Sequence, residues 1–481
     1  MYKCQYTSKG KALGEGSFGE VSLVERNGYP YVMKKMKVDK DEDGEFEPSS
    51  FQNPIELDIM FRLNSPYLVE GVDITVAGEC DPDSVGVVQE FIAGNLLEDV
   101  DKMSYSDKKR CMLDLALGLN CLHTNKFLHL DIKLENALYH KEKKPRAVLI
   151  DYGLVAYCPK GVEEGVDTSD RGTVYYYSPK VAKAPEKESF HYTDKDDIWS
   201  LGITFCEFMV SIHEIYSMLD ANSTDDDKKF LKKINQHHTY YLNKKNIDEF
   251  LEKIILSDIK ISKKEKELFK SLVKGMLDLD ENKRFNIKQV IDHPFFSGIE
   301  ESKFCVKRQS QIFSLDHVDT DIIKKGLDTI MYKAKEFISG RPLEILFMAI
   351  DIYLRVLAQA SDDVINKYSK LPSVCLMIAS KYFFWADIRN KFDAEIFELS
   401  EEENIIFKII GGRINEDRYF CNFKYLEQAQ AIYNIFLKPE APIGYNPNIT
   451  KYLQYDGKNY VEELNIDEGT SISNATISDL L

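Results

Sequence analysis

The sequence reads Leu13-Gly14-Glu15-Gly16-Ser17-Phe18-Gly19-Glu20-Val21 within a run that has the pattern of β-strands. This G-x-G-x-x-G-x-V motif lies between two predicted strands and does not lead into a helix. Only a backbone without Cβ atoms closes over the oxygens of a triphosphate and offers its N–H groups to them. The motif therefore predicts a phosphate-binding loop, although an ordinary glycine-rich turn fits it equally well when it is taken alone.

Strands come first along the chain and helices follow. The β-patterned runs Leu13 to Glu25 and Tyr31 to Val38 are joined by Asn27-Gly28, whose tolerance of positive φ favours a tight hairpin. Beyond Ser106 the pattern becomes helical, and Ile198 to Val210 is nearly apolar throughout, as buried helices are. This order predicts an α+β fold with segregated lobes, the first rich in strands and the second helical.

Composition excludes several classes of function. The formal net charge of −17 over 481 residues argues against nucleic acid as the main partner, because phosphate backbones require a basic surface. The nine cysteines are scattered singly, which is typical of a reducing compartment and of neither a disulfide framework nor a zinc site. Charged residues interrupt the apolar stretch Leu343 to Ala358, and the first residues lack a secretory signal. We therefore expect an intracellular protein that does not bind a membrane.

Three further motifs follow the glycine motif. They are Lys34 on the predicted third strand, the H-x-D-x-K-x-x-N run from His129 to Asn136, and Asp151-Tyr152-Gly153. Taken singly, they could be a solvated lysine, a core histidine and a turn aspartate. Their order and spacing together resemble the eukaryotic-type protein kinases. The resemblance continues through Gly172-Thr173, Asp197-Ile198-Trp199 and Asn282-Lys283-Arg284 to residue 298.

The resemblance implies a two-lobed kinase fold and transfer of the γ-phosphate of ATP, with Mg²⁺, to protein Ser or Thr hydroxyls. Asp131 would accept or orient the hydroxyl proton, and Lys133 would neutralise the transferring phosphate. Asn136 and Asp151 would hold Mg²⁺, while Lys133 and Thr173 are typical of the serine/threonine class. The resemblance also implies a hinge near Glu90-Phe91-Ile92, with Gln89 as the gatekeeper behind the adenine. The residues implied to bind the nucleotide are Leu13, Gly14, Gly16, Ser17, Gly19, Val21, Lys34, Glu90 and Ile92.

Lys34 needs a carboxylate partner on the αC helix of such a site. We expect this partner to be Glu56, two residues after Pro54. A capping role competes, since Asn53 as helix cap and Pro54 as the first helical residue would make Glu56 the end of a capping box. The ion pair is favoured because an otherwise complete kinase site would leave Lys34 unpaired.

Two regions resemble cyclin-dependent kinases and their activators. Tyr31 to Asp39 and Glu47-Pro48-Ser49-Ser50 resemble a strand and the start of the PSTAIRE helix of these kinases. The last part of the chain reads as helices only, over Ile322 to Ile338, Pro342 to Ala358, Leu371 to Phe384 and Ser400 to Ile410.

Leu343 to Arg355 and Leu371 to Tyr382 resemble helices two and three of a cyclin box. Lys381 and Glu403 match the cyclin residues that bind the αC region, which implies contacts with the backbone between Ser49 and Asn53. A generic helical extension is the alternative, because helical periodicity is common.

Some positions depart from the cyclin-dependent kinases. Leu130, Ile55 and Ala156 replace three arginines that bind a phosphothreonine in that family, so we expect Thr168 not to control activity. Lys180 stands where a glutamate would pair with Arg284. Glu186 and Glu188 are candidates to substitute for that glutamate.

We therefore expect a kinase domain over 1–298 with lobes dividing near residue 92, a linker over 299–317, a cyclin-box-like domain over 318–440 and a flexible acidic tail over 441–481. The leading hypothesis is a serine/threonine kinase that its own cyclin-like domain activates. The alternative is a pseudokinase or regulatory binding protein whose cyclin-like domain captures another kinase. Such a fusion is similar to kinase–cyclin proteins of giant DNA viruses, which implies the cytoplasm or nucleus of a host cell, or a virion.

Overall fold

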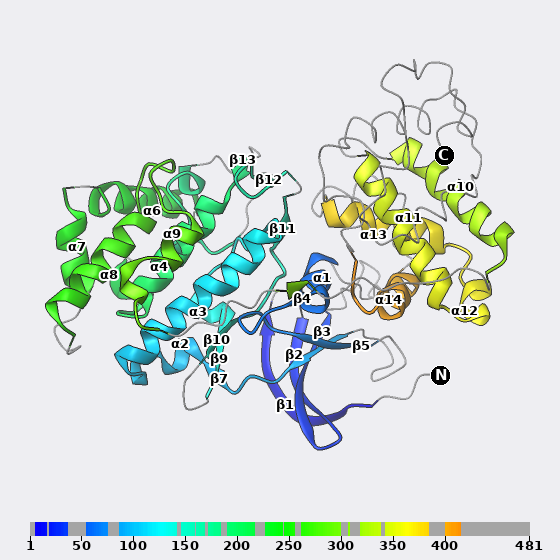
Figure 1. Cartoon of the computed structure of the whole chain (residues 1–481), viewed down its shortest axis with the longest axis horizontal. Helices are drawn as coiled ribbons and strands as arrows, with labels where there is room; N and C mark the ends of the chain where they lie inside the picture. Colours follow the sequence, from blue (N-terminus) through cyan, green and yellow to red (C-terminus); the bar gives the residue numbers. More distant parts are fainter. Residues whose placement is uncertain are drawn as a thin grey trace, which may run out of the picture. The chain divides into compact units, whose positions relative to one another are not determined.

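The computed structural model describes residues 5–16, 19–36, 54–75, 86–141, 146–158, 160–168, 172–183, 190–216, 227–243, 245–254, 261–299, 306–307, 318–337, 342–383 and 400–414. These residues fall into two compact units (Figure 1). The first unit comprises the described parts of Met1–Leu63, Glu70–Glu90 and Lys307–Leu481, and the second comprises those of Asn64–Val69 and Phe91–Val306. The β-rich N-terminal segment is thus grouped with the C-terminal helices.

A five-stranded antiparallel sheet forms the N-terminal part of the first unit. Its strand order is β1-β2-β3-β6-β5, from β1 (Thr7–Gly16), β2 (Gly19–Arg26), β3 (Tyr29–Met36), β5 (Gly71–Thr75) and β6 (Gly86–Glu90). Asn27 and Gly28 turn the β2–β3 hairpin with φ angles of 54° and 82°, as the sequence predicts. The predicted single run Leu13 to Glu25 is instead two strands, because the glycine motif itself turns the chain between them.

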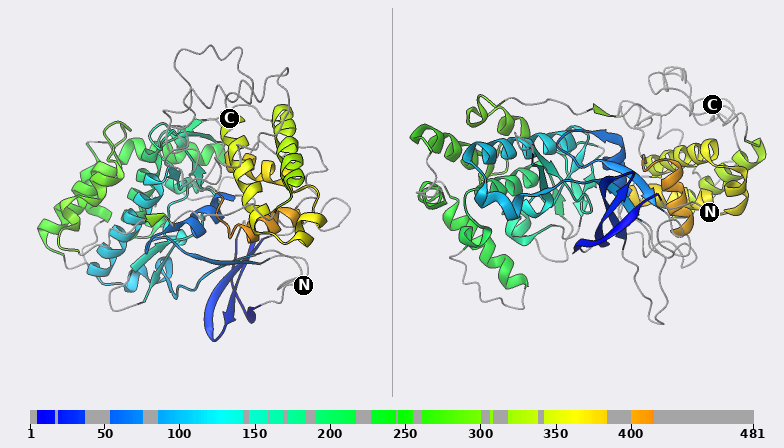
Figure 2. Two further views of the ribbon diagram at one scale, coloured as in Figure 1. Left: turned by 45° about the vertical axis from the view of Figure 1, so that its right-hand side comes forward. Right: turned by 90° about the horizontal axis from the view of Figure 1, so that it is seen from below.

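Helices complete the first unit. The helix α1 (Pro54–Arg62) is buried along its whole length, and the others are α10 (Thr320–Phe337), α11 (Pro342–Gln359), α12 (Asp362–Lys367), α13 (Leu371–Phe383) and α14 (Ser400–Ile409). Four of these begin and end within two residues of the helices expected from the sequence, whereas α12 was not expected. The helix α11 packs along α13, and α10 packs against both (Figure 2).

Contacts within the first unit join the C-terminal helices to the N-terminal residues. The helix α13 packs against α1, and α14 packs against β5. Phe61 of α1 lies so close to Gly71 and Gly412 that a Cβ at either glycine would stand 2.7 Å or 2.4 Å from its ring. Both glycines are therefore required by the close approach of the aromatic ring rather than by the turn alone.

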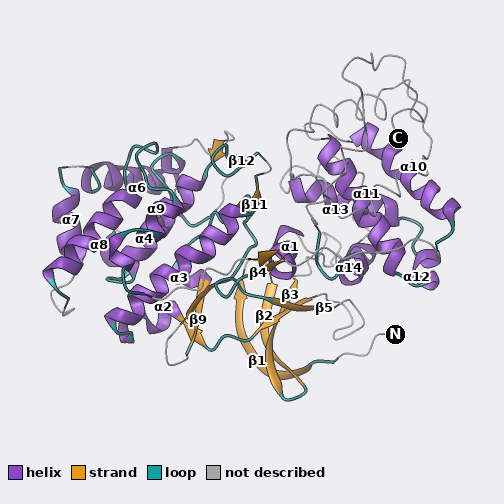
Figure 3. Ribbon diagram, in the orientation of Figure 1, coloured by secondary structure: helices purple, strands orange, loops and turns teal. Residues whose placement is uncertain are grey.

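The second unit is mainly helical (Figure 3). Its helices are α2 (Leu96–Asp99), α3 (Tyr105–Thr124), α4 (Asp194–Glu207), α5 (Ile212–Ile215), α6 (Asp227–Tyr241), α7 (Ile247–Ile254), α8 (Lys263–Met276) and α9 (Ile287–Ile291). Ser104 and Ser262 cap α3 and α8 by accepting backbone N–H groups, and Thr193 with Asp196 forms a capping box on α4. These caps fix where the long helices begin.

Short strands and 3₁₀ turns connect these helices. The strand β9 (Ala137–His140) lies between β10 (Arg146–Leu149) and β7 (Gly94–Asn95), β8 (Phe127–Leu128) pairs with β11 (Ala156–Tyr157), and β12 (Val166–Thr168) pairs with β13 (Phe190–Tyr192). The 3₁₀ turns span Val100–Lys102, Leu134–Asn136, Val174–Tyr176, Val181–Lys183 and Pro294–Phe296. Two further short strands, β4 (Leu63–Asn64) and β14 (Val306–Lys307), lie at the boundaries of the units.

Among the described helices, none combines the length and apolarity needed to cross a membrane. Most of the predicted linker and all of the predicted acidic tail lie outside the described residues, as do Glu186, Glu188 and the segment from Ser49 to Asn53.

Candidate active site

The loop after β8 carries His129, Leu130 and Asp131 and is held by a buried aspartate of α4. Asp197 accepts hydrogen bonds from the backbone N–H groups of His129 at 2.9 Å and Leu130 at 2.8 Å. It also lies 2.8 Å from Nε2 of His123. Leu130 has a φ angle of 68°, a strained conformation for a residue with a Cβ, and the Asp197 carboxylate stabilises it.

His129 supports the backbone of Asp131 from inside the protein. Its Nδ1 accepts the N–H of Asp131 at 3.3 Å, and its ring is fully buried. Burial lowers the pKa of His129 below its usual value, because the charged form would lose its hydration. The imidazole is therefore neutral and acts as an acceptor that orients the loop.

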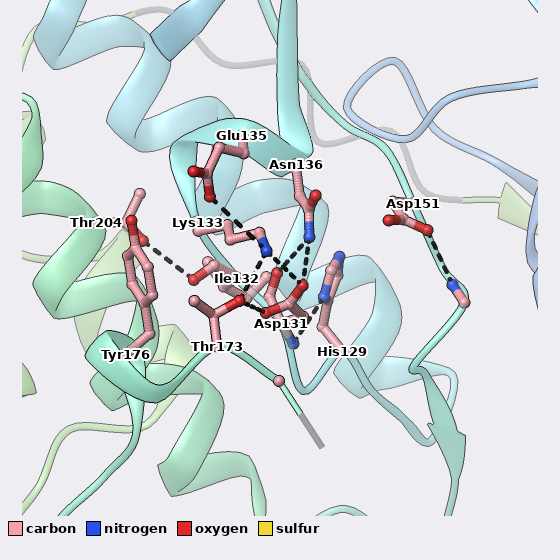
Figure 4. Close-up of polar contacts among 12 residues, drawn as sticks. His129, Asp131, Ile132, Lys133, Glu135, Asn136, Asp151, Thr173, Tyr176 and Thr204 are labelled. Atoms are coloured by element: carbon pink, nitrogen blue, oxygen red, sulfur yellow. Dashed lines mark hydrogen bonds and ion pairs between the residues drawn. The ribbon is translucent and has the colours of Figure 1, made fainter. Parts of the chain in front are cut away.

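Three predicted site residues converge on the carboxylate of Asp131 (Figure 4). The hydroxyl of Thr173 donates to Oδ1 at 2.7 Å, and Asn136 Nδ2 donates to Oδ2 at 2.9 Å. The ammonium of Lys133 lies 3.0 Å from Oδ2 and donates to the Thr173 hydroxyl at 2.7 Å. The Asp131 carboxylate is thus held by three groups. Lys133 and Asn136 come from the same short run of sequence, and Thr173 comes from a segment farther along the chain.

Gly172 brings that distant threonine into place. Its φ angle is 94°, and a Cβ at this position would stand 2.4 Å from the carbonyl oxygen of Leu130. Because no other residue accepts both conditions without a shift, the glycine lets the segment before Thr173 lie directly on the catalytic loop.

Asp151 lies two residues after the end of β10, in a left-handed conformation with a φ angle of 60°. Its Oδ1 accepts the N–H of Gly153 at 3.3 Å. The intervening Tyr152 is fully buried, and its hydroxyl donates to the carbonyl of Leu149 at 2.9 Å and accepts the N–H of Val69 at 3.0 Å. This anchor was not predicted from the sequence.

Lys34 and Glu56 meet in the first unit. The strand β3 places Lys34 opposite Val21 of β2 and Val87 of β6, and α1 presents Glu56. The ammonium of Lys34 lies 2.6 Å from Oε1 of Glu56, and both side chains are buried. The competing cap residue, Asn53, lies outside the described residues.

The glycine motif forms the tip of the β1–β2 hairpin, with Gly14 opposite Val21 and Gly16 opposite Gly19. Ser17 lies outside the described residues, and Leu13 is 40% exposed. Of the other residues predicted to bind the nucleotide, Glu90 ends β6 and exchanges backbone and side-chain hydrogen bonds with Glu70, while Ile92 is buried in the second unit.

Leu130 and Ala156, at two of the three positions where the resembled family has arginine, lie in an apolar cluster of the second unit. Its buried members pack with partly buried residues of the segment that follows β11, and the set is Leu128, Leu130, Ala156, Cys158, Val162, Val166, Tyr177, Val181 and Tyr192. We call this set the Leu130 cluster. Thr168 ends β12 and pairs with Phe190 of β13, so its backbone is ordered by a strand ladder.

Lys180 finds acidic partners of its own. Its ammonium lies 2.9 Å from Asp196 and 3.1 Å from Glu281, and Glu281 also accepts the hydroxyl of Thr193 at 2.8 Å. Arg284 is buried and donates to the backbone carbonyls of Asp278 and Lys195. Lys180 therefore has Asp196 and Glu281 as acidic partners, and neither was predicted from the sequence.

Lys381 and Glu403 pair with each other. The ammonium of Lys381 lies 2.9 Å from both carboxylate oxygens of Glu403, so this pair joins α13 to α14. Their predicted contacts with the backbone between Ser49 and Asn53 fall outside the described residues.

Comparison with known proteins agrees with this geometry. The family model of the protein kinase domain matches residues 7–296, which is well over half of the chain. The chain therefore belongs to the protein kinase family, and the family predicted from the glycine motif, Lys34 and the H-x-D run is confirmed.

Three relatives illustrate the range of similarity. The serine/threonine-protein kinase Nek6 of Oryza sativa is 31% identical over 47% of this chain and 39% of its own length. The probable CTD kinase subunit alpha homolog of Encephalitozoon cuniculi is 27% identical over 44% of this chain and 60% of its own length. The serine/threonine-protein kinase KIN28 of Saccharomyces cerevisiae is 28% identical over 46% of this chain and 69% of its own length. This chain thus spans less than two thirds of the first two relatives.

Proposed function

We propose that the chain is an ATP- and Mg²⁺-dependent kinase that phosphorylates Ser or Thr hydroxyls of proteins. The observation that carries the proposal is the fixed carboxylate of Asp131, with Thr173, Lys133 and Asn136 around it. Phosphoryl transfer requires little covalent chemistry from the protein and depends on positioning and on neutralising charge. The serine/threonine kinases among the relatives support the substrate class.

Each residue around Asp131 has a part in this proposal. The carboxylate accepts or orients the proton of the incoming hydroxyl, and Thr173 and Asn136 hold it in one orientation. Lys133 offers a positive charge beside it, 3.0 Å away, where the γ-phosphate would transfer. Lys34, held by Glu56 at 2.6 Å, would bind the other phosphates.

Asn136 and Asp151 fit the Mg²⁺ that such a reaction requires. Mg²⁺ prefers oxygen ligands, and Asp151 offers a partly exposed carboxylate. The amide nitrogen of Asn136 is engaged by Asp131, which leaves its carbonyl oxygen as the ligand. When bound, the metal would neutralise charge on the phosphates.

The C-terminal helices are proposed to act as a cyclin-like activator in cis, over about residues 318–440. Supporting this part are the packing of α13 on α1 and of α14 on β5 within the first unit. Since α1 carries Glu56, whatever holds α1 also holds the partner of Lys34. The alternative of a domain that captures another kinase is less favoured, because this face of α13 already contacts α1 of its own chain.

Transfer of radiolabelled phosphate from ATP to a protein substrate tests the activity. We expect Asp131→Asn to lower turnover at least about 100-fold, as for loss of a positioned general base. Glu164→Gln removes an exposed carboxylate of the same unit and serves as the matched control. Equal turnover of Asp131→Asn and the wild type would overturn the assignment, and ATP binding without transfer in the wild type would favour the pseudokinase.

A further inference from the structure

Asp58 is a fully buried carboxylate on α1, two residues after Glu56. Arg62, one turn later on the same helix, binds its Oδ2 through Nε at 2.9 Å and Nη2 at 2.8 Å. A buried carboxylate needs hydrogen bonds to its remaining lone pairs as well as a counter-charge. At Asp58 these bonds come from the C-terminal domain.

Two groups far along the chain complete the shell of Asp58. The hydroxyl of Tyr382, in the last turn of α13, donates to Oδ2 at 2.9 Å. The backbone N–H of Ile414 donates to Oδ1 at 3.0 Å. Both donors are buried, and the two bonds connect residues 324 and 356 positions apart. Hydrogen bonds to an ionised acceptor are among the strongest in proteins.

A second buried ion pair holds the segment that carries Ile414. Arg355 of α11 is 1% exposed, pairs with Asp351 at 2.8 Å and donates to the carbonyls of Arg413 and Ile414, the latter at 2.6 Å. The Ile414 residue therefore binds Arg355 through its C=O and Asp58 through its N–H. This line of contacts runs from α11 to α1 without an exposed step.

The turn before Ile414 is built for this approach. Gly411 and Gly412 have φ angles of 58° and 70°, and Gly412 lies against the ring of Phe61 on α1. The turn therefore touches α1 twice, through Phe61 and through Asp58.

We propose that Asp58 is the positioning residue through which the C-terminal domain holds α1, and that Tyr382 and the Arg355-bound Ile414 are its docking partners. The helix α1 has nine residues, too few to be stable in isolation, so its position depends on tertiary contacts. When Asp58 loses these hydrogen bonds, α1 becomes more mobile, and the ion pair between its Glu56 and Lys34 is weakened. For this catalytic consequence the inference rests on the proposed kinase activity.

The test compares the full-length wild type with Tyr382→Phe, Asp58→Asn and the double variant. Tyr382→Phe deletes one oxygen and leaves the core packing unchanged. Tyr353→Phe is the matched control, because the hydroxyl of this buried tyrosine donates to the carbonyl of Ile322 at 3.1 Å, within the C-terminal helices and away from Asp58. The first readout is amide hydrogen exchange of residues 54–62, and the second is kcat and KM for ATP.

We expect α1 amides to exchange about tenfold faster in Tyr382→Phe, since a bond to a charged group is lost in the opening reaction. In the double variant, the increase in the exchange rate of the α1 amides should be smaller than the product of the increases in the two single variants, because both changes remove the same hydrogen bond. The variants whose α1 amides exchange faster should also have the lower kcat. Tyr353→Phe should match the wild type in both hydrogen exchange and kcat.

Unchanged exchange of α1 in both single variants, or effects that multiply fully in the double variant, would overturn the role of Asp58. If the wild type transferred no phosphate, the proposed function would fail, but the exchange measurement would still decide whether the C-terminal domain holds α1 through Asp58.

Discussion

Removing one oxygen from Thr173 tests whether the threonine orients Asp131 or merely lines the site. The perturbation is Thr173→Val, which keeps the shape of the side chain and deletes the hydroxyl. This hydroxyl donates to Asp131 at 2.7 Å and accepts from Lys133 at 2.7 Å, so the change frees both the carboxylate and the ammonium.

The bond to Asp131 is charge-assisted and partly buried, and such bonds contribute about 1.5–3 kcal/mol. If that contribution is expressed fully in the transition state, turnover should fall roughly 10- to 150-fold at about 1.4 kcal/mol per factor of ten. The effect should appear in kcat, because the fixed carboxylate acts on the reacting hydroxyl and not on the adenine end of ATP.

The assay is steady-state phosphate transfer at saturating ATP, with Thr173→Ser as the conservative partner. Serine keeps the hydroxyl and should retain turnover within a few-fold of the wild type. Turnover of Thr173→Val within twofold of Thr173→Ser would refute the reasoning, since the two variants differ chiefly in the hydroxyl.

Asp151→Asn should lower transfer at least about 100-fold, since it removes charge that offsets the phosphates, while the thermal midpoint in differential scanning fluorimetry stays unchanged. Thr168→Ala should leave turnover unchanged, because the Leu130 cluster around the expected receptor is apolar; phosphate found at Thr168 by mass spectrometry, together with a large loss in Thr168→Ala, would contradict this. Burial lowers the pKa of His237 from its usual value of 6.5 to about 4. Between these two pH values the unfolded chain binds a proton at His237 and the folded chain does not. The stability linked to His237 is therefore present above pH 6.5 and is lost as the pH falls toward 4. In urea unfolding, the free energy of unfolding should fall between pH 6.5 and 5, and this fall should be about 2 kcal/mol smaller in His237→Gln than in the wild type.

The catalytic cluster was predictable because its members sit close together in the sequence. Asp131, Lys133 and Asn136 lie within one short run, and their chemistry follows from residue type and spacing. Glu56 was predictable as the partner of Lys34 because an otherwise complete kinase site would leave Lys34 without a carboxylate from the helix that became α1.

Long-range partners were not predictable in the same way. No local pattern links Asp58 to Tyr382, since a hydrogen bond across 324 residues leaves no periodicity in the sequence. Lys180 was recognised as an anomaly, but its partner Glu281 lies 101 residues away, and the sequence-based candidates were chosen for proximity along the chain. The short helix α12 did have a local signal, because Ser361 precedes Asp362 and Asp363 at its start.

The distance along the chain between Asp58 and its partners also has a consequence for biosynthesis. Thr173, the last of the catalytic residues, leaves the ribosome roughly 200 residues before Tyr382, which at about 5–20 residues per second is an interval of about 10–40 s. During this interval the nascent chain has every group for phosphate transfer but lacks the donors that hold α1 through Asp58. If the proposal above holds, the kinase becomes active only after the C-terminal helices have been synthesised. A message with a premature stop codon before Tyr382 would then yield an inactive truncated chain and not an unregulated kinase.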